Sequence, residues 1–138
     1  MQAAGIDLWT YQWRTEEFLE IARTQQDNEN ILAREANRML ICDTDALSTG
    51  IWHERYPRRR SPEVEAIAES CRHHLYLLTD CDIPFVQDGL RDGETIRRWM
   101  TQRFEEVLTE KGLSWIKVSG GPEERLARAV YEVDKLLR

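Results

Sequence analysis

Three stretches of the sequence combine charged residues or glycines in patterns that suit the binding and transfer of a phosphoryl group. The first is the apolar run 39–42 (MLIC), which stops at Asp43 and Asp45. A carboxylate at the end of a rigid buried strand can hold Mg²⁺, or its bound water, at a fixed distance from the phosphates of a nucleotide. The nearby hydroxyls of Ser48 and Thr49 favour a polar site. The same pattern also fits a strand that ends in a turn or in a helix-capping Asp.

The second stretch is residues 82–98, where three arginines surround a loop rich in glycine: Arg91, Arg97 and Arg98. Mobile arginines that close over a transferring phosphoryl group neutralise the charge that develops on it. Glycines let such a loop swing. The alternative is a surface loop whose arginines pair with the acids of the same stretch, Asp82 among them.

The third stretch is residues 118–128 (VSGGPEERLAR), in which Gly120 and Gly121 precede a helix start. A glycine turn allows the backbone to approach a nucleotide base closely. An ordinary turn between a strand and a helix has the same composition. The basic run 58–60 could meet phosphate or form a solvated loop.

Short apolar runs alternate with helical patterns, and together these elements must position the three stretches. Strands are expected at 39–42, at 74–80 and within 113–121, the last ending in the glycine turn. Helices are expected at 15–38, at 46–56, from Ser61 and Pro62, around 96–108 and from Pro122. Thr15 and Ser61 are the expected helix-capping hydroxyls. The last helix is expected to face inward with Leu126, Val130, Val133 and Leu137.

This alternation predicts an α/β fold with a parallel sheet and flanking helices, in one domain spanning residues 1–138. In such sheets ligands bind at the carboxyl ends of the strands. All three expected strands end in polar or glycine-rich loops, so we expect one site along that rim.

The composition excludes several classes of protein. The chain has 138 residues, 41% of them hydrophobic and 32% charged, which is typical of a soluble globular protein. The net charge of -6 argues against a nucleic-acid partner. No apolar run approaches the roughly 20 residues of a membrane span. The three cysteines have no paired spacing and favour a reducing cytoplasm. Together with the neighbouring histidines they are not spaced as zinc ligands.

Four segments together resemble the P-loop kinase domain of NadR-type proteins, a family with nicotinamide riboside kinase activity. The segments are IARTQQDNE (21–29), LICDTDALSTGIW (40–52), YLLTDCDIPFVQDGLRD (76–92) and VSGGPEERLARA (118–129). They cover most of the chain in the order of the family. The DTD edge and the PFVQDGLRD loop are the most specific parts.

The resemblance implies an ATP- and Mg²⁺-dependent kinase that phosphorylates the ribose 5′-hydroxyl of nicotinamide riboside, giving nicotinamide mononucleotide for NAD synthesis. Its partners would be a small nucleoside and ATP, with no nucleic acid and no membrane. The implied site residues are Asp43 as the Walker B acid and metal ligand, Asp45 and Trp52 toward the nucleoside, Arg91 with Arg97 or Arg98 as lid arginines, and Gly120 and Arg125 near the adenine.

The chain departs from this family at its start. The family opens with a strand and a Gly-x-x-x-x-Gly-Lys-Ser/Thr loop, the Walker A segment, whereas no Gly-Lys dipeptide occurs here. The resemblance therefore implies an N-terminally truncated P-loop fold. We expect residues 1–138 alone to bind ATP weakly and to lack kinase activity. Either strands 39–42 and 74–80 pair directly, or a homo-oligomer or an N-terminal segment complements the sheet.

The missing loop supports an alternative from another class. In that alternative the chain is a non-catalytic regulatory module with a degenerate kinase fold, which binds a nucleotide or a protein partner. A third interpretation is a kinase of the same architecture with another small substrate.

Overall fold

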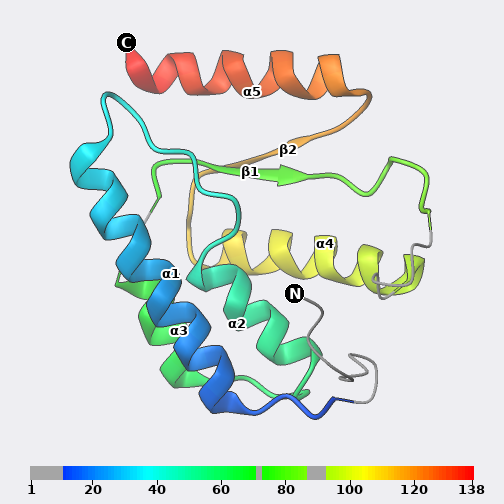
Figure 1. Ribbon diagram of the computed structural model, residues 1–138. Helices are drawn as coiled ribbons and strands as arrows, with labels where there is room; N and C mark the ends of the chain where they lie inside the picture. The colour runs from blue at the N-terminus through cyan, green and yellow to red at the C-terminus, as the bar shows by residue number, and fades with distance from the viewer. Residues whose placement is uncertain (1–10, 71–72, 87–92) are drawn as a thin grey trace, which may run out of the picture. The chain divides into compact units, whose positions relative to one another are not determined.

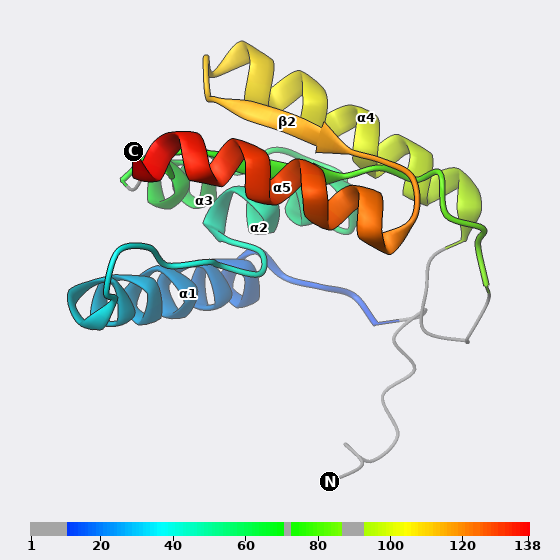
Figure 2. The same cartoon turned by 90° about the horizontal axis from the view of Figure 1, so that it is seen from above.

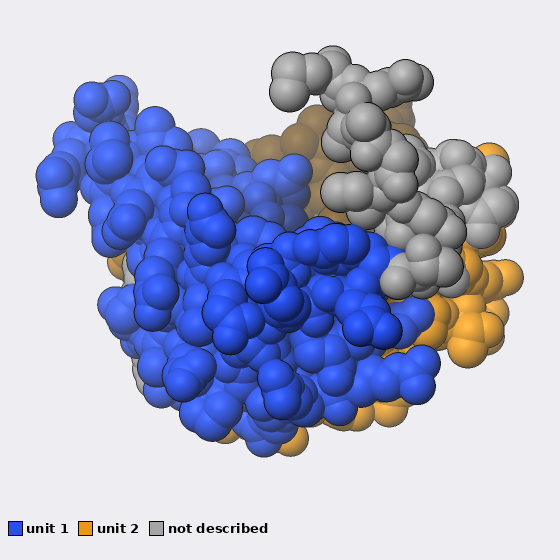
Figure 3. All heavy atoms as spheres, turned by 60° about the horizontal axis from the view of Figure 1, so that its bottom comes forward, with its two compact units in different colours: residues 1–72 blue, residues 73–138 orange. Residues whose placement is uncertain are grey.

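The computed structural model describes residues 11–70, 73–86 and 93–138 (Figure 1). The chain divides into two compact units, Met1–Arg72 and His73–Arg138, called unit 1 and unit 2 below and coloured blue and orange in Figure 3. The prediction of a single domain concerns both units together and stays a prediction.

In unit 1 the described residues form helices, and in unit 2 they form helices and strands. The elements of unit 1 are α1 (Thr15–Glu35), α2 (Ala46–Arg55) and α3 (Pro62–Glu69). Those of unit 2 are β1 (Tyr76–Thr79), α4 (Glu94–Glu110), β2 (Trp115–Val118) and α5 (Pro122–Leu137). The expected helices all form, with ends a few residues from their predicted positions.

The core of unit 1 is a small cluster to which all three of its helices contribute. Phe18 and Ala22 come from α1, Ala46 from the start of α2 and Val64 from α3, and all are buried. Trp13 packs against this cluster from the segment before α1. Burying one large apolar side chain contributes about 1.5–3 kcal/mol. A core this small depends on each of its members.

His53 of α2 is fully buried and ties three segments of unit 1 together. Its Nδ1 lies 2.7 Å from the carbonyl oxygen of Arg59, and its Nε2 lies 3.0 Å from the Thr15 hydroxyl. A carbonyl can only accept, so Nδ1 carries a proton and donates it. The guanidinium of Arg59 donates in turn to Thr15 Oγ1 at 3.0 Å. The start of α1 is thus joined to α2 and to the loop before α3.

The two predicted helix caps have different outcomes. Ser61 caps α3 as predicted, and its side chain accepts from the Val64 N–H. The prediction for Thr15 is wrong, because the N-cap of α1 is Arg14 and its backbone N–H donates to the Glu17 carboxylate at 2.8 Å. The Thr15 hydroxyl bonds to His53 instead.

The expected strand at 39–42 is also wrong, since these residues form no regular element. Met39 and Leu40 are exposed, and Ile41 is 76% exposed. A strand exists only where a neighbouring strand satisfies its backbone groups. In the parts of the chain that the structure describes, β1 and β2 pair only with each other. Asp43 therefore follows an extended loop rather than a buried strand.

Unit 2 is a small parallel α/β unit. β1 and β2 run side by side in the same direction, in a register that pairs Tyr76 with Trp115 and Thr79 with Val118 (Figure 2). α4 covers one face of this two-stranded sheet and α5 the other (Figure 1). The predicted α/β class with parallel strands is confirmed at this level. The wider P-loop-like sheet is not seen among the described residues.

The inward face predicted for α5 is only partly correct. Val133 and Leu137 are half-buried, but Leu126 is 65% exposed and Val130 is 48% exposed. A sheet of two strands is too narrow to cover the whole apolar stripe of a helix of this length. None of the described helices is long and apolar enough to cross a membrane.

The role of His53 predicts a large effect of its removal. His53→Ala leaves the Arg59 carbonyl without its buried donor and opens a cavity, and we expect it to lower the free energy of unfolding by about 2 kcal/mol. Urea unfolding followed by circular dichroism measures this, with the exposed His74→Ala as the control. Equal stability of the two variants would contradict the role given to His53.

Candidate functional site

The carboxyl ends of β1 and β2 lie at the same edge of the sheet, because the two strands are parallel. The Asp80 N–H continues the ladder by donating to the Val118 carbonyl at 3.0 Å. Asp80 and Asp82 follow β1, while Ser119 and Gly120 follow β2. The two loops therefore meet at the edge where ligands bind in parallel sheets.

Asp80 joins the two loops through its carboxylate. Oδ2 accepts from the Ser119 hydroxyl at 2.7 Å, and Oδ1 accepts from the Cys81 N–H at 2.7 Å. The hydroxyl of Ser119, the N–H of Cys81 and the charge of Lys117 lower the pKa of Asp80. Each favours the ionised form. Asp80 is therefore a negative charge that holds the end of β2 beside the end of β1.

Asp82 and Arg125 fix the turn at Gly120. The Gly120 N–H donates to Asp82 Oδ2 at 2.6 Å, and Asp82 Oδ1 forms an ion pair with Arg125. Arg125 Nε donates to the Gly120 carbonyl at 2.8 Å, and its Nη2 donates to the Asp80 carbonyl at 3.3 Å. Side chains thus bind both backbone polar groups of Gly120.

The conformation of Gly120 requires glycine. Its φ is +88°, in the left-handed region that residues with a Cβ rarely adopt. A Cβ there would also lie 2.6 Å from the Glu124 carboxylate and 3.3 Å from Glu124 Cβ. This geometry explains the glycine in the turn, while the expected approach of a nucleotide base stays a prediction. The turn has no side chain of its own at this position, and the Glu124 carboxylate fills the space that a Cβ would take.

The adjacent arginines of α4 differ in their surroundings. Arg97 Nη1 donates to the Ile83 carbonyl at 2.5 Å, and its guanidinium lies 5.5 Å from the centre of the Phe85 ring. Arg97 thus anchors the segment after β1 to the first turn of α4. The Arg98 side chain is 73% exposed and lies near Glu94. Arg91, the third predicted lid residue, lies outside the described residues.

The Asp43 segment lies in unit 1, before α2. Asp43 is exposed, and Thr44 has a φ of +65°. A left-handed backbone is uncommon for a β-branched residue and carries strain. Asp45 is buried as the N-cap of α2, and its Oδ1 accepts from the backbone N–H and the hydroxyl of Ser48, both at 2.9 Å. The helix-capping interpretation thus applies to Asp45, and Asp43 remains available to a ligand.

Trp52, the other residue predicted to face the nucleoside, lies on α2 about two turns after Asp45. Its ring stacks on Tyr56 with centroids 5.7 Å apart and planes 14° apart. The side chain is partly exposed. It combines a flat apolar face with access to solvent, which suits contact with an aromatic ligand.

Comparison with known proteins identifies the family. Residues 4–125 match the family model described as "AAA domain", which covers most of the chain. The chain belongs to the AAA domain family. Nucleotide binding is general in this family. The sequence is 32% identical over 105 residues to the "Trifunctional NAD biosynthesis/regulator protein NadR" of Escherichia coli (strain K12).

The protein of the same name from Salmonella typhimurium (strain LT2) is 30% identical over 105 residues. In both comparisons the match covers 74% of this AAA domain chain. The chain spans about a quarter of the length of these curated relatives, 26% in each case. The resemblance to NadR-type proteins found in the sequence is therefore confirmed.

The structure brings some predicted site residues together and separates others. Gly120 and Arg125 share one turn of unit 2, whereas Asp43, Asp45 and Trp52 belong to unit 1. Sequence reasoning assigned no role in the site to three residues of the sheet edge: Asp80, Asp82 and Ser119. The signal for two of them was present, since Asp80 and Ser119 directly follow the paired strands.

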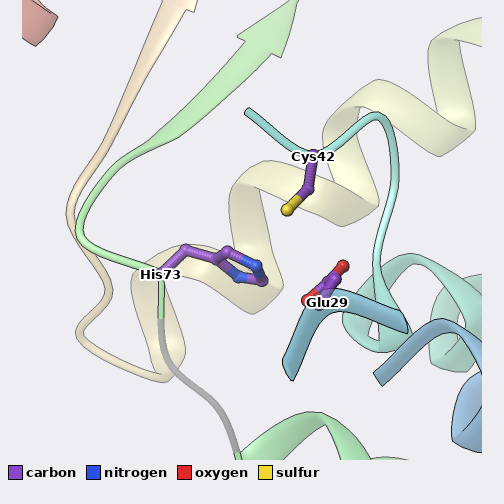
Figure 4. Close-up of side chains that lie close together, drawn as sticks. All are labelled: Glu29, Cys42 and His73. Carbon is purple, nitrogen blue, oxygen red and sulfur yellow. The ribbon is translucent and has the colours of Figure 1, made fainter. Parts of the chain in front are cut away.

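Three residues that can bind metals are drawn in Figure 4: Glu29 on α1, Cys42 in the segment before α2, and His73 at the start of unit 2. No metal site is assigned to them, because Glu29 and Cys42 belong to unit 1 and His73 to unit 2.

The contact between Asp80 and Ser119 predicts an acid-dependent stability. A carboxyl whose pKa is lowered by folding stabilises the fold above its unfolded pKa, and the contribution is lost as the pH falls through the folded pKa. Ser119→Ala removes the largest cause of this lowering. We expect the variant to be less stable than the parent above about pH 4 and to approach it at lower pH.

Urea unfolding at a series of pH values measures this difference, with the exposed Ser114→Ala as the control. A difference between parent and Ser119→Ala that is the same in acid and at neutral pH would contradict the assigned role of Asp80.

Proposed function

We propose that this AAA domain is the kinase domain of a NadR-type protein and phosphorylates nicotinamide riboside with ATP. The observation that carries the proposal is the similarity to NadR proteins along 74% of the chain. In the proposed reaction the ribose 5′-oxygen bonds to the γ-phosphorus of ATP and the bond to ADP breaks. The hydroxyl proton is released to solvent, and the product is nicotinamide mononucleotide. The proposed compartment is the cytoplasm.

In unit 1 the proposal gives Asp43 the role of holding Mg²⁺. Mg²⁺ is usually bound by one or two carboxylates together with the phosphates of the substrate, and the exposed carboxylate of Asp43 fits that donor set. Bound Mg²⁺ would neutralise charge on the phosphates. Trp52 is proposed to contact the nucleoside through its exposed ring. Asp45 is proposed to shape the same nucleoside site through its position as the cap of α2.

In unit 2 the proposal gives the turn at Gly120 the role of receiving the adenine. A turn without a side chain at Gly120 is proposed to let its backbone come close to a flat ring. Arg125 is given a role in shaping this turn, since its guanidinium is already bound by Asp82 and by two carbonyl groups. Its contribution to adenine binding is therefore proposed to be indirect.

The charge on the transferring phosphoryl group is proposed to be neutralised by Arg91 and Arg98. An exposed guanidinium can turn toward a phosphate without breaking a buried contact, and Arg98 meets this condition. Arg97 would have to leave the Ile83 carbonyl and the Phe85 ring, and would then no longer hold the segment after β1. Of the two alternatives that the sequence left open, we therefore favour Arg98.

A non-catalytic nucleotide-binding module is the second candidate function. It is favoured by the engagement of Arg97 and Arg125 with groups of the protein itself, and by the absence of a Gly-Lys dipeptide from these 138 residues. Such a module would bind ATP and transfer nothing. The two candidates therefore differ in product formation and agree in nucleotide binding.

The kinase proposal predicts a specific effect of Asp43. In the protein as its gene encodes it, incubation with nicotinamide riboside, ATP and Mg²⁺ is expected to yield nicotinamide mononucleotide, measured by chromatography. Asp43→Asn is expected to abolish this transfer without lowering the melting temperature, because the side chain is exposed. ATP binding without product would favour the non-catalytic module.

Asp45→Ala is the matched comparison two residues away. It removes a buried helix cap and is expected to cost about 1 kcal/mol of stability. An Asp43→Asn variant that stays active but melts at a lower temperature would show a structural role for Asp43 instead.

The adjacent arginines provide a second test of the kinase proposal. We expect Arg98→Ala to lower kcat by about 100-fold, with little change in melting temperature, because it removes a donor that acts on the transition state. Arg97→Ala is expected to lower the melting temperature, because it releases the segment after β1. Steady-state kinetics and thermal melting of both variants decide. An unchanged kcat in Arg98→Ala would remove Arg98 from the site.

A further inference from the structure

Asp82 occupies a position that the proposed function does not use. One of its oxygens accepts from the Gly120 N–H, and the other pairs with Arg125. Arg125 in turn binds the Gly120 carbonyl. Asp82, Gly120 and Arg125 thus close a ring of contacts between the segment after β1 and the turn after β2, across 38 to 43 residues of sequence.

The exposures of the ion pair show which partner depends on the other. The Arg125 side chain is 13% exposed, whereas that of Asp82 is 37% exposed. A guanidinium that has lost most of its contact with water requires a counter-charge and acceptors for its N–H groups. Removing Asp82 would leave this cation with carbonyl partners alone, and it would leave the Gly120 N–H without its acceptor.

The same ring of contacts determines what the turn can offer a ligand. The N–H of Gly120 is taken by Asp82, whereas the carbonyl accepts from Arg125 and keeps a second lone pair that can accept from the edge of a base. Beyond that acceptor the turn offers its peptide backbone, held by a φ of +88° at Gly120, with the Glu124 carboxylate on the side that a Cβ would face. A flat ring can lie against this backbone only while the peptide planes on either side keep their orientation.

We propose that Asp82 is a positioning residue of the nucleotide site, which holds the Gly120 turn in the orientation that receives the base of a nucleoside triphosphate. The proposal rests on the proposed nucleotide binding at this turn. Asp82 acts through Gly120 and Arg125 and touches no reacting atom. Removing Asp82 should therefore weaken the binding of the base and leave the binding of the phosphates unchanged.

The test compares two probes, ATP and inorganic tripolyphosphate, in calorimetric titrations of the protein as its gene encodes it. Tripolyphosphate carries the phosphate chain without the base. Asp82→Ala is expected to raise the Kd of ATP about tenfold, the equivalent of one lost charge-assisted hydrogen bond, and to leave the Kd of tripolyphosphate unchanged. The exchange of the Gly120 amide hydrogen, followed by NMR, is expected to accelerate in the same variant.

Glu132→Ala is the matched control. Glu132 also belongs to ion pairs in unit 2, with Arg128 at 3.2 Å and with Lys135 at 2.6 Å, but it lies on α5 beyond the turn. It should change neither Kd. Asp82→Asn provides a second variant that keeps the shape of the side chain while removing its charge. If Asp82→Ala fails to fold, the same comparison of ATP with tripolyphosphate is made on Asp82→Asn.

Two results would overturn the proposal. One is an unchanged Kd of ATP in the Asp82 variants. The other is an equal loss of affinity for both probes together with a lower melting temperature, which would show that Asp82 only stabilises the fold. Failure of the parent protein to bind ATP is a different result. It would overturn the proposed function, and the role of Asp82 with it, before any variant is measured.

Discussion

The parallel pairing of β1 with β2 is the constraint on which the geometry of unit 2 depends. Two parallel strands place their carboxyl ends at one edge, so the loops that follow them must meet there. Asp80 extends the pairing by one backbone hydrogen bond and then binds Ser119 with its side chain. The contacts of Asp82 and Arg125 with Gly120 begin where this pairing ends. Without the shared edge, none of these residues would be neighbours.

Unit 1 is organised by contacts made at the ends of its helices. His53 connects the first residue of α1 with the loop before α3, and Asp45 fixes the start of α2. Between the extended loop and this cap, Thr44 adopts a left-handed backbone. The cap and the turn together leave Asp43 exposed while the carboxylate of Asp45, two residues later, is buried. A local backbone constraint thus leaves Asp43 exposed to solvent and buries Asp45 as a helix cap.

The sequence predicted best what is determined locally. The start of α3 at Ser61 and Pro62 is specified by a few adjacent residues, and the two strands of unit 2 form where they were expected because each is the partner of the other. The strand at 39–42 was wrong because a strand also needs a partner, and apolarity alone does not supply one. Thr15 was misassigned because a distant histidine uses its hydroxyl. The expected roles of Asp43, Trp52 and Arg91 stay predictions, since they depend on a ligand.

Contacts between residues far apart in the sequence could not be predicted from the sequence. One alternative from the sequence was that the acids after β1 pair with the arginines of their own stretch, but Asp82 pairs with Arg125, 43 residues away. Similarly, Arg97 and Arg98 are residues of the same type and adjacent in the sequence. They differ because α4 turns Arg97 toward Ile83 and Phe85 and turns Arg98 toward solvent. Both also lie near Glu94, so the difference between them comes from helix phase and tertiary packing.

The distribution of the arginines limits what the site can do without rearrangement. Arg97 and Arg125 bind carbonyl groups and a carboxylate of the protein, so neither can approach a phosphate unless these contacts break and the loops lose their anchors. Their charges are used to hold the loops at the edge of the sheet. The exposed guanidinium of Arg98 carries no such cost. The proposed phosphoryl transfer would need such an arrangement, in which two arginines hold the loops while a third, paired with Glu94 at the surface, turns toward the phosphate.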